Sequence, residues 1–214
     1  MKAFKGYDET KVDFGERLKL GGHICKILEV KIEEYTTKEN KKFEQLVMKI
    51  DTTENDIQPG YYQKKFAEDA KADAMKAKWK GFYRVAIPQD DSEEQTKVTF
   101  KRFITSIEKS NPGFTWNWEE NLLIGKVFGG VFGLEEFIGT DGNVISFSKC
   151  RFTRSIEKIE EVEIPKVKLV DKTYMDYEEY IAKRKAEREA KDTNTISENN
   201  SNSIFEGSED ELPF

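Results

Sequence analysis

Histidine, cysteine and proline are scarce in this chain, with one, two and five residues. A structural role is favoured over catalysis for His23, which stands beside the start of a predicted strand. Cys25 and Cys150 lie far apart and outside any CxxC spacing, which predicts a reduced, buried pair and no metal site. Carboxylates show no metal-ligand spacing, and no Gly-Lys-Ser/Thr motif follows the glycines of 129–133. We therefore expect no enzyme, no metal and no cofactor.

Long apolar runs are also missing. No stretch approaches the roughly 18 residues that cross a bilayer, and the first 18 residues lack the continuous apolar region of a signal peptide. The sequence thus predicts a cytoplasmic protein with no membrane partner.

Acidic charge is concentrated at one end of the chain. The formal net charge is −6, and the segment 192–214 holds six acids and no base. Positions 1–191 therefore carry 35 basic and 35 acidic residues, a neutral body that can gather cations on one face. Two stretches are locally basic: 61–84, with seven Lys/Arg against three acids, and 146–158, with four against one.

The alternation of apolar residues predicts the strands. A long first strand follows Gly22, and its apolar residues on both parities indicate burial on both faces. In 43–52, Leu46, Met48 and Ile50 share one face. The aromatic stretch 61–66 is interpreted as strand three, and the Ala-rich 67–78 as a helical insertion.

The second half of the body adds a helix and two strands. Phe100, Phe103, Ile104 and Ile107 follow helical spacing within 96–110. The glycine-containing stretch 122–137 predicts a strongly coiled fourth strand, and 145–156 a fifth. The order β-β-β-α-β-β is what a five-stranded OB barrel requires, so we predict a mainly β fold with one such barrel.

Three regions follow from these patterns. Residues 1–160 form the predicted barrel, and 161–191 form an extended linker and a charged helix over 173–191. Residues 192–214 are polar and acidic and are expected to be disordered. Trp116 and Trp118 are expected to pack beneath the barrel.

Aromatic and basic residues gather on the predicted strands two, three and five. Binding of single strands needs cations for phosphates and flat side chains on which bases stack. For each single residue, burial in the core or simple solvation is about as good an explanation, and the cluster as a whole is the stronger signal. The candidates for nucleic-acid contact are Lys31, Tyr35, Phe43, Lys49, Tyr61, Tyr62, Lys64, Lys65, Trp79, Arg84, Arg151 and Arg154.

The chain ends on an apolar tip after an acidic run. An acidic leash with such a tip can dock its ring in a pocket while its carboxylates meet Lys or Arg on a partner. A merely solubilising tail would explain the charge but not the apolar residues. The candidates for partner contact are Glu209, Asp210, Glu211, Leu212, Pro213 and Phe214.

This tip resembles the C-terminus of bacterial single-stranded DNA-binding proteins, which ends in Ile-Pro-Phe; Leu212 replaces the isoleucine. The stretches 20–27 and 103–118 are similar to phage and mobile-element proteins of Gram-positive bacteria regarded as single-stranded DNA-binding proteins. The resemblance implies an OB fold, action in DNA replication, recombination or repair in a bacterial host cytoplasm, and recruitment of a helicase, polymerase or recombinase. A charged helix replaces the usual Gly/Gln-rich linker, so the resemblance leaves a homo-oligomer as one option.

One rival interpretation stays open. A phage adaptor would bind a host protein through the barrel and acidic tail without touching DNA. Salt dependence distinguishes the two, because affinity for single strands falls with salt at a log–log slope of about −0.7 per neutralised phosphate.

Overall fold

The computed structural model describes residues 16–36, 40–90, 92–139 and 144–170, together with positions 182 and 186. In these ranges the chain forms one five-stranded antiparallel sheet with two α-helices and two short 3-10 helices. The elements follow one another as β1 (Gly21–Thr36), β2 (Lys42–Thr52), α1 (Tyr61–Ala72), β3 (Phe82–Ala86), α2 (Glu94–Ser110), η2 (Glu120–Leu123), β4 (Val127–Ile138), β5 (Val144–Arg154) and η3 (Ile156–Lys158).

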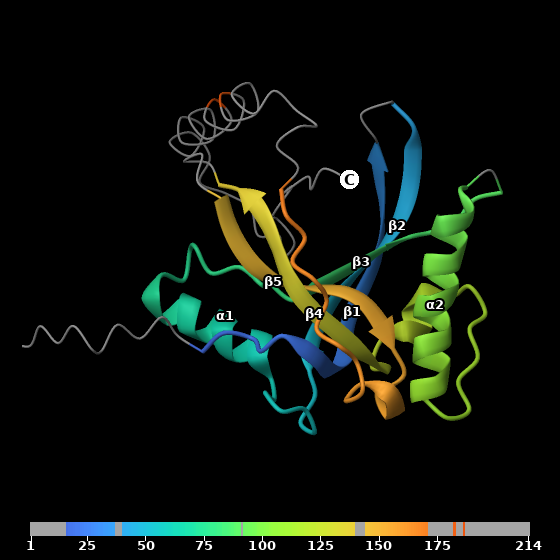
Figure 1. Ribbon diagram of the computed structural model, residues 1–214, viewed down its shortest axis with the longest axis horizontal. Helices are drawn as coiled ribbons and strands as arrows, with labels where there is room; N and C mark the ends of the chain where they lie inside the picture. Colours follow the sequence, from blue (N-terminus) through green and yellow to red (C-terminus); the bar gives the residue numbers. More distant parts are fainter. Residues whose placement is uncertain are drawn as a thin grey trace, which may run out of the picture.

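The long strand β1 joins two halves of the sheet. Its first part, 21–26, pairs with β4, and nearly its whole length from Cys25 onward pairs with β2. The strand order is β3-β2-β1-β4-β5 (Figure 1). A bulge between Ile27 and Glu29 shifts the register, and such a bulge bends the strand and increases its twist. The two halves therefore curve around a common core.

The sheet approaches a barrel but its backbone ladder is not closed. Within the described ranges β3 and β5 share no backbone pairing, and we call the gap between them the seam. Side chains cross it: Tyr83 on β3 and Cys150 on β5 belong to the same buried cluster. Burial raises the pKa of Tyr83, so its hydroxyl stays protonated at neutral pH. The fold is thus mainly β and barrel-like.

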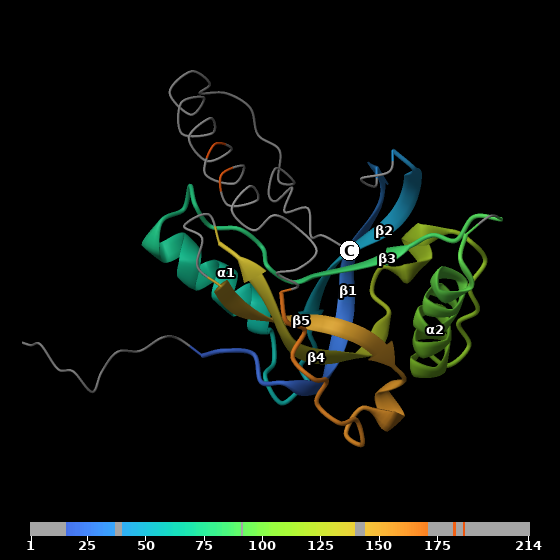
Figure 2. The ribbon, with the colours of Figure 1, turned by 45° about the horizontal axis from the view of Figure 1, so that its top comes forward.

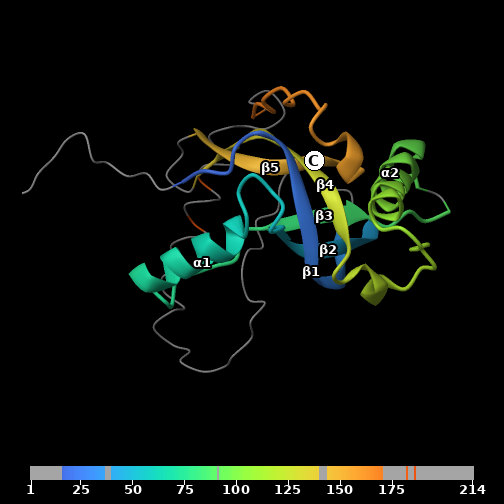
Figure 3. The same cartoon turned by 90° about the horizontal axis from the view of Figure 1, so that it is seen from below.

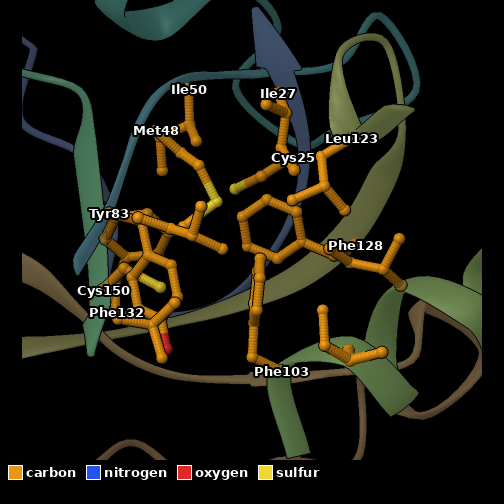
Figure 4. Packing of buried hydrophobic residues seen from close by; sticks show 14 of the residues in the cluster. Cys25, Ile27, Met48, Ile50, Tyr83, Phe103, Leu123, Phe128, Phe132 and Cys150 are labelled. Atoms are coloured by element: carbon orange, nitrogen blue, oxygen red, sulfur yellow. The ribbon is translucent and has the colours of Figure 1, made fainter. Parts of the chain in front are cut away.

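The core fills the space inside this curved sheet. Phe103 reaches in from α2 and meets Tyr83 of β3 and Phe128 of β4 at centroid distances of 5.7 and 6.3 Å (Figure 4). Met48 and Cys25 point toward each other from β2 and β1 in the same view. Both cysteines are buried and unbridged, as the sequence predicts.

The predicted burial patterns of β2 and β1 are confirmed. Leu46, Met48 and Ile50 are all buried on one face of β2. On β1, Gly21, His23, Cys25 and Ile27 are buried, and Ile24 and Leu28 on the other parity are half-buried. After the bulge Val30 packs against the core.

Strand three was predicted in the wrong place. Residues 61–66 form the first half of α1, and the third strand is β3 at 82–86. The cause is a non-local cap: the buried Asp51 carboxylate, at the end of β2, accepts the backbone amides of Tyr62 and Gln63 at 2.8 and 3.1 Å. A carboxylate at this place satisfies the otherwise unpaired amides of a helix start.

The predicted helix in 96–110 is confirmed as α2, and the predicted fifth strand as β5. The fourth strand begins later than expected, because 120–123 form η2. The charged helix at 173–191 lies outside the described residues except at positions 182 and 186, which are helical. The acidic tail lies wholly outside them.

His23 has the structural role that the sequence favours. Its Nδ1 lies 2.9 Å from Asp56 Oδ1, and its Nε2 lies 2.9 Å from the carbonyl oxygen of Lys19. Asp56 also accepts the backbone amides of Ile24 and Gln58. The pair fastens the segment before β1 to the loop after β2.

Asp56→Asn should lower the free energy of unfolding by about 2–3 kcal/mol at pH 7, because it removes a buried charge that accepts several hydrogen bonds. Burial alone would raise the pKa of Asp56, but the bonds from His23, Gln58 and Ile24 outweigh it and leave that pKa below its ordinary value. The stabilisation is therefore present above the unfolded pKa of about 3.9 and lost as pH falls through the lower folded pKa. Urea unfolding at several pH values should show the gap between wild type and variant closing below about pH 4; a constant gap would contradict this assignment.

Asp51→Ala should destabilise the protein by about 2 kcal/mol, because buried amides lose their acceptor. Asp69→Ala is the matched control, since Asp69 makes only an exposed pair with Lys80 and should change stability by less than about 0.5 kcal/mol. Thermal unfolding of the two variants measures the difference. Equal effects would mean that Asp51 does not set the start of α1.

Candidate nucleic-acid interface

The two outer sides of the sheet differ in what covers them. Over the β4 half, Ile159 lies against Gly22 and Gly129, and Pro165 lies against Gly133. A Cβ at Gly22 would lie 2.2 Å from the Ile159 carbonyl oxygen, so the close approach requires glycine there. The segment 156–170 therefore covers this half.

The other half presents side chains outward. We call the side of β1, β2 and β3 that is turned away from the core the outer face. Cross-strand partners in an antiparallel sheet lie on the same face, so the register assigns its residues. The outer face consists of Glu29, Lys31, Glu33, Tyr35, Phe43, Gln45, Val47, Lys49, Phe82, Arg84 and Ala86.

Aromatic rings occupy both ends of the outer face. Toward the β1–β2 turn, Tyr35 and Phe43 are cross-strand partners whose rings stack with centroids 5.7 Å apart and planes at 25°. At the other end Phe82 pairs with Lys49, whose Nζ lies 4.8 Å from the centre of the Trp79 ring. Flat rings therefore flank the middle of the face.

Cations occupy the middle of the outer face. Lys31, Val47 and Arg84 lie side by side across β1, β2 and β3. Arg84 is exposed, its guanidinium lies 5.4 Å from the centre of the Phe82 ring, and no described carboxylate pairs with it. Across the seam, Lys149 of β5 pairs with Glu135 at 3.1 Å, and Glu135 also pairs with Lys168. Among the described cations of this region, Arg84 is therefore the one without a carboxylate partner.

Acids on the same face hold two of these cations. Lys49 Nζ lies 2.7 Å from Glu29, and Lys31 pairs with Glu33. Their side chains are between 18 and 41% exposed, so these pairs are partly solvated. Ion pairs in such positions contribute roughly 0–1 kcal/mol and can exchange for another anion at small cost.

The structure brings together six of the twelve predicted nucleic-acid residues. Five lie on the outer face, and Trp79 lies at its border. Its indole nitrogen donates to the carbonyl oxygens of Gly81 and Ile50 at 3.0 and 3.3 Å, which fixes the ring under Lys49.

The predicted residues of 61–65 lie on α1 and not on a strand. Tyr62 is 7% exposed and packs in the core, so its ring is not available for stacking, and Tyr61 packs beside it. Lys64 is exposed, and Lys65 pairs with Glu68 at 2.7 Å.

The two predicted arginines of β5 lie on the covered half. Arg151 occupies a bulge in the β4–β5 ladder, with its Cγ near Gly133, and its Nη1 is buried without an acceptor among the described residues. Arg154 is exposed and borders an open cleft formed with 161–166, which includes Glu161 and Glu163. Glu161 and Glu163 balance Arg154 and Lys166 there, so the cleft carries no excess of positive charge.

The twelve candidates leave out Phe82, and the sequence misjudged Trp118. Phe82 shares its parity with Arg84, a signal that the misplaced third strand concealed. Trp116 packs against the core as expected, but Trp118 is 67% exposed and stacks on Phe100 at 5.7 Å.

The described ranges contain no helix long and apolar enough to cross a membrane, and no group of three or more His, Cys, Asp or Glu side chains that could hold a metal ion. The six tip candidates, Glu209, Asp210, Glu211, Leu212, Pro213 and Phe214, lie outside the described residues. Neither a protein-family model nor a curated protein matches the chain.

Proposed function

We propose that this protein binds single-stranded DNA without strong sequence preference, in replication or recombination of phage or mobile-element DNA, through an OB-type barrel. The observation that carries the proposal is the outer face, where Lys31, Lys49 and Arg84 lie between two aromatic groups on the side of the curved sheet that is turned away from the core. Proteins that hold single strands combine these two elements.

The arrangement of the strands supports the OB assignment. The helix α2 lies between β3 and β4 in the chain, and buried side chains of β3 and β5 share one core across the seam. OB barrels are five-stranded and partly open, and they bind oligonucleotides on the face of their second and third strands and on adjacent loops. Here β2 and β3 carry Phe43, Lys49 and Arg84 on the outer face.

The proposed binding step is an exchange of ion pairs. Phosphates replace Glu29 at Lys49 and Glu33 at Lys31, while Arg84 takes a phosphate without losing a partner among the described residues. Bases stack on Phe82 and on the Tyr35–Phe43 pair, at about 1–3 kcal/mol for each stacked base. The bound strand thus lies across β1, β2 and β3.

Removing a positive charge from the outer face and removing a negative charge from it should change DNA affinity in opposite directions. Arg84→Gln should weaken binding of oligo-dT and reduce the log–log salt slope by about 0.7. Glu29→Gln should strengthen binding, because it frees Lys49 and removes a negative charge near the phosphates. Fluorescence anisotropy at several salt concentrations, with a matched duplex for comparison, measures both.

Arg154→Gln is the matched control, because Arg154 also lies over a phenylalanine, Phe152, at 5.5 Å but on the covered half. It should change the affinity by less than twofold. No binding of oligo-dT by wild type would contradict the DNA proposal and favour an adaptor that binds only protein. Equal loss from Arg84→Gln and Arg154→Gln would move the site away from the outer face.

The proposal gives the acidic tail a separate role, supported by the sequence alone. Residues 209–214 recruit a helicase, polymerase or recombinase, with Phe214 in an apolar pocket and the carboxylates on basic side chains of that enzyme.

Phe214→Ala should leave oligo-dT affinity within twofold of wild type and abolish binding of that enzyme, because the tip is separate from the outer face. Purified candidate enzymes immobilised on a sensor surface, and challenged with wild type, Phe214→Ala and a chain lacking 192–214, measure the effect. Binding of the same enzyme equally by all three proteins would exclude the tip.

A further inference from the structure

Side chains alternate in exposure through the segment that leads from α1 into β3. Ala77, Trp79, Gly81, Tyr83 and Val85 are buried or half-buried, whereas Lys78, Lys80 and Arg84 are exposed. Lys76, at the start of this segment, is also exposed. We call Lys76, Lys78, Lys80 and Arg84 the basic row. Figure 2 shows the segment running from the end of α1 into β3.

Buried neighbours hold the basic row in place. A Cβ at Gly81 would lie 2.4 Å from the Ile50 carbonyl oxygen and 2.5 Å from the Tyr62 ring, so the backbone passes tightly between β2 and α1. The Gly81 carbonyl oxygen accepts both the Ile50 amide and the Trp79 indole N–H. The residues with the opposite parity are thereby kept on the surface.

The charges of the basic row are available to an anion. Lys80 pairs with Asp69 at 2.7 Å and Lys76 with Asp73 at 3.3 Å, but the two lysine side chains are 64 and 85% exposed. Lys78 has no carboxylate partner among the described residues. Exposed pairs of this kind are weak, and a phosphate oxygen replaces the carboxylate at small cost.

The basic row is continuous with the outer face. Arg84 belongs to both, and Phe82 separates Arg84 from Lys80 along the chain. Beyond Phe82 the exposed members of the row are lysines, which bind phosphate as point charges and provide no stacking surface. The contacts offered to a DNA strand therefore change along the basic row. The sheet offers aromatic rings and cations, and the lysines beside α1 offer cations alone.

We propose that Lys76, Lys78 and Lys80 bind successive phosphates of a DNA strand that leaves the outer face past Phe82 and continues along α1. This inference rests on the proposed function and extends it, because it gives the bound strand a direction across the molecule. It predicts that long oligonucleotides make contacts that short ones cannot reach.

The experiment compares oligo-dT of roughly six and roughly twenty nucleotides, lengths that bracket common site sizes of single OB domains. The test variant replaces Lys76, Lys78 and Lys80 by Gln in the full chain. The control variant replaces Lys101, Arg102 and Lys109 by Gln, three exposed cations on α2. Helices α1 and α2 lie on opposite sides of the sheet (Figure 3), so both variants remove the same charge at different places.

Wild type should bind the long oligonucleotide with a steeper salt slope than the short one. The test variant should lose about two units of that slope, at about 0.7 per phosphate, and keep wild-type affinity for the short oligonucleotide. The control variant should keep the length difference. Thermal unfolding checks that both variants remain folded.

Two results would overturn the inference while the proposed function stands: an unchanged slope in the test variant, or an equal loss in the control variant. Failure of wild type to bind either oligonucleotide would overturn the proposed function itself, and this inference with it.

Discussion

The pairing of one long strand with two neighbours is the constraint on which this structure depends. β1 pairs with β4 through its first residues and with β2 through most of its length, and the bulge after Ile27 turns one part relative to the other. Without that turn the sheet would be flatter, and the apolar sides of its halves would not enclose Phe103 and Phe128. The curvature also separates the side covered by 156–170 from the outer face, and the proposed DNA site is on the outer face.

Charge balance reconciles the proposed binding of a polyanion with a net charge of −6. The outer face is not strongly basic in the free protein, because Glu29 and Glu33 lie beside Lys49 and Lys31. Binding then depends on exchange of anions at fixed cations and on aromatic surfaces whose contribution is independent of salt. A site of this kind holds single strands firmly only when both contributions act together, which limits adventitious binding to other polyanions.

Local sequence patterns correctly predicted the helices and strands whose contacts with distant parts of the chain do not override the local conformational preference. The alternation of Leu46, Met48 and Ile50 predicted β2 and placed Phe43 and Lys49 on its other side, and helical spacing predicted α2. The aromatic stretch 61–66 has the composition of a strand, but its first amides are accepted by the Asp51 carboxylate and the Thr52 hydroxyl at the end of β2, which favours the start of a helix there. Arg151 and Arg154 were misjudged for a related reason. Their chemistry suits phosphate, but which half of the sheet they occupy, and what covers that half, is decided by long-range pairing that no local pattern contains.

The unclosed seam has a consequence for self-association. Edge strands offer unpaired backbone groups to other chains and are common sites of aggregation. Here β3 is only five residues long, carries Arg84, and is followed closely by Pro88, which has no amide to donate. Its free edge is turned toward β5, and Tyr83 of β3 packs in the same buried cluster as Cys150 of β5. The two strands thus shield each other's edges from other chains. A closed barrel protects its edges by backbone pairing, whereas here the side chains and the short length of β3 do so.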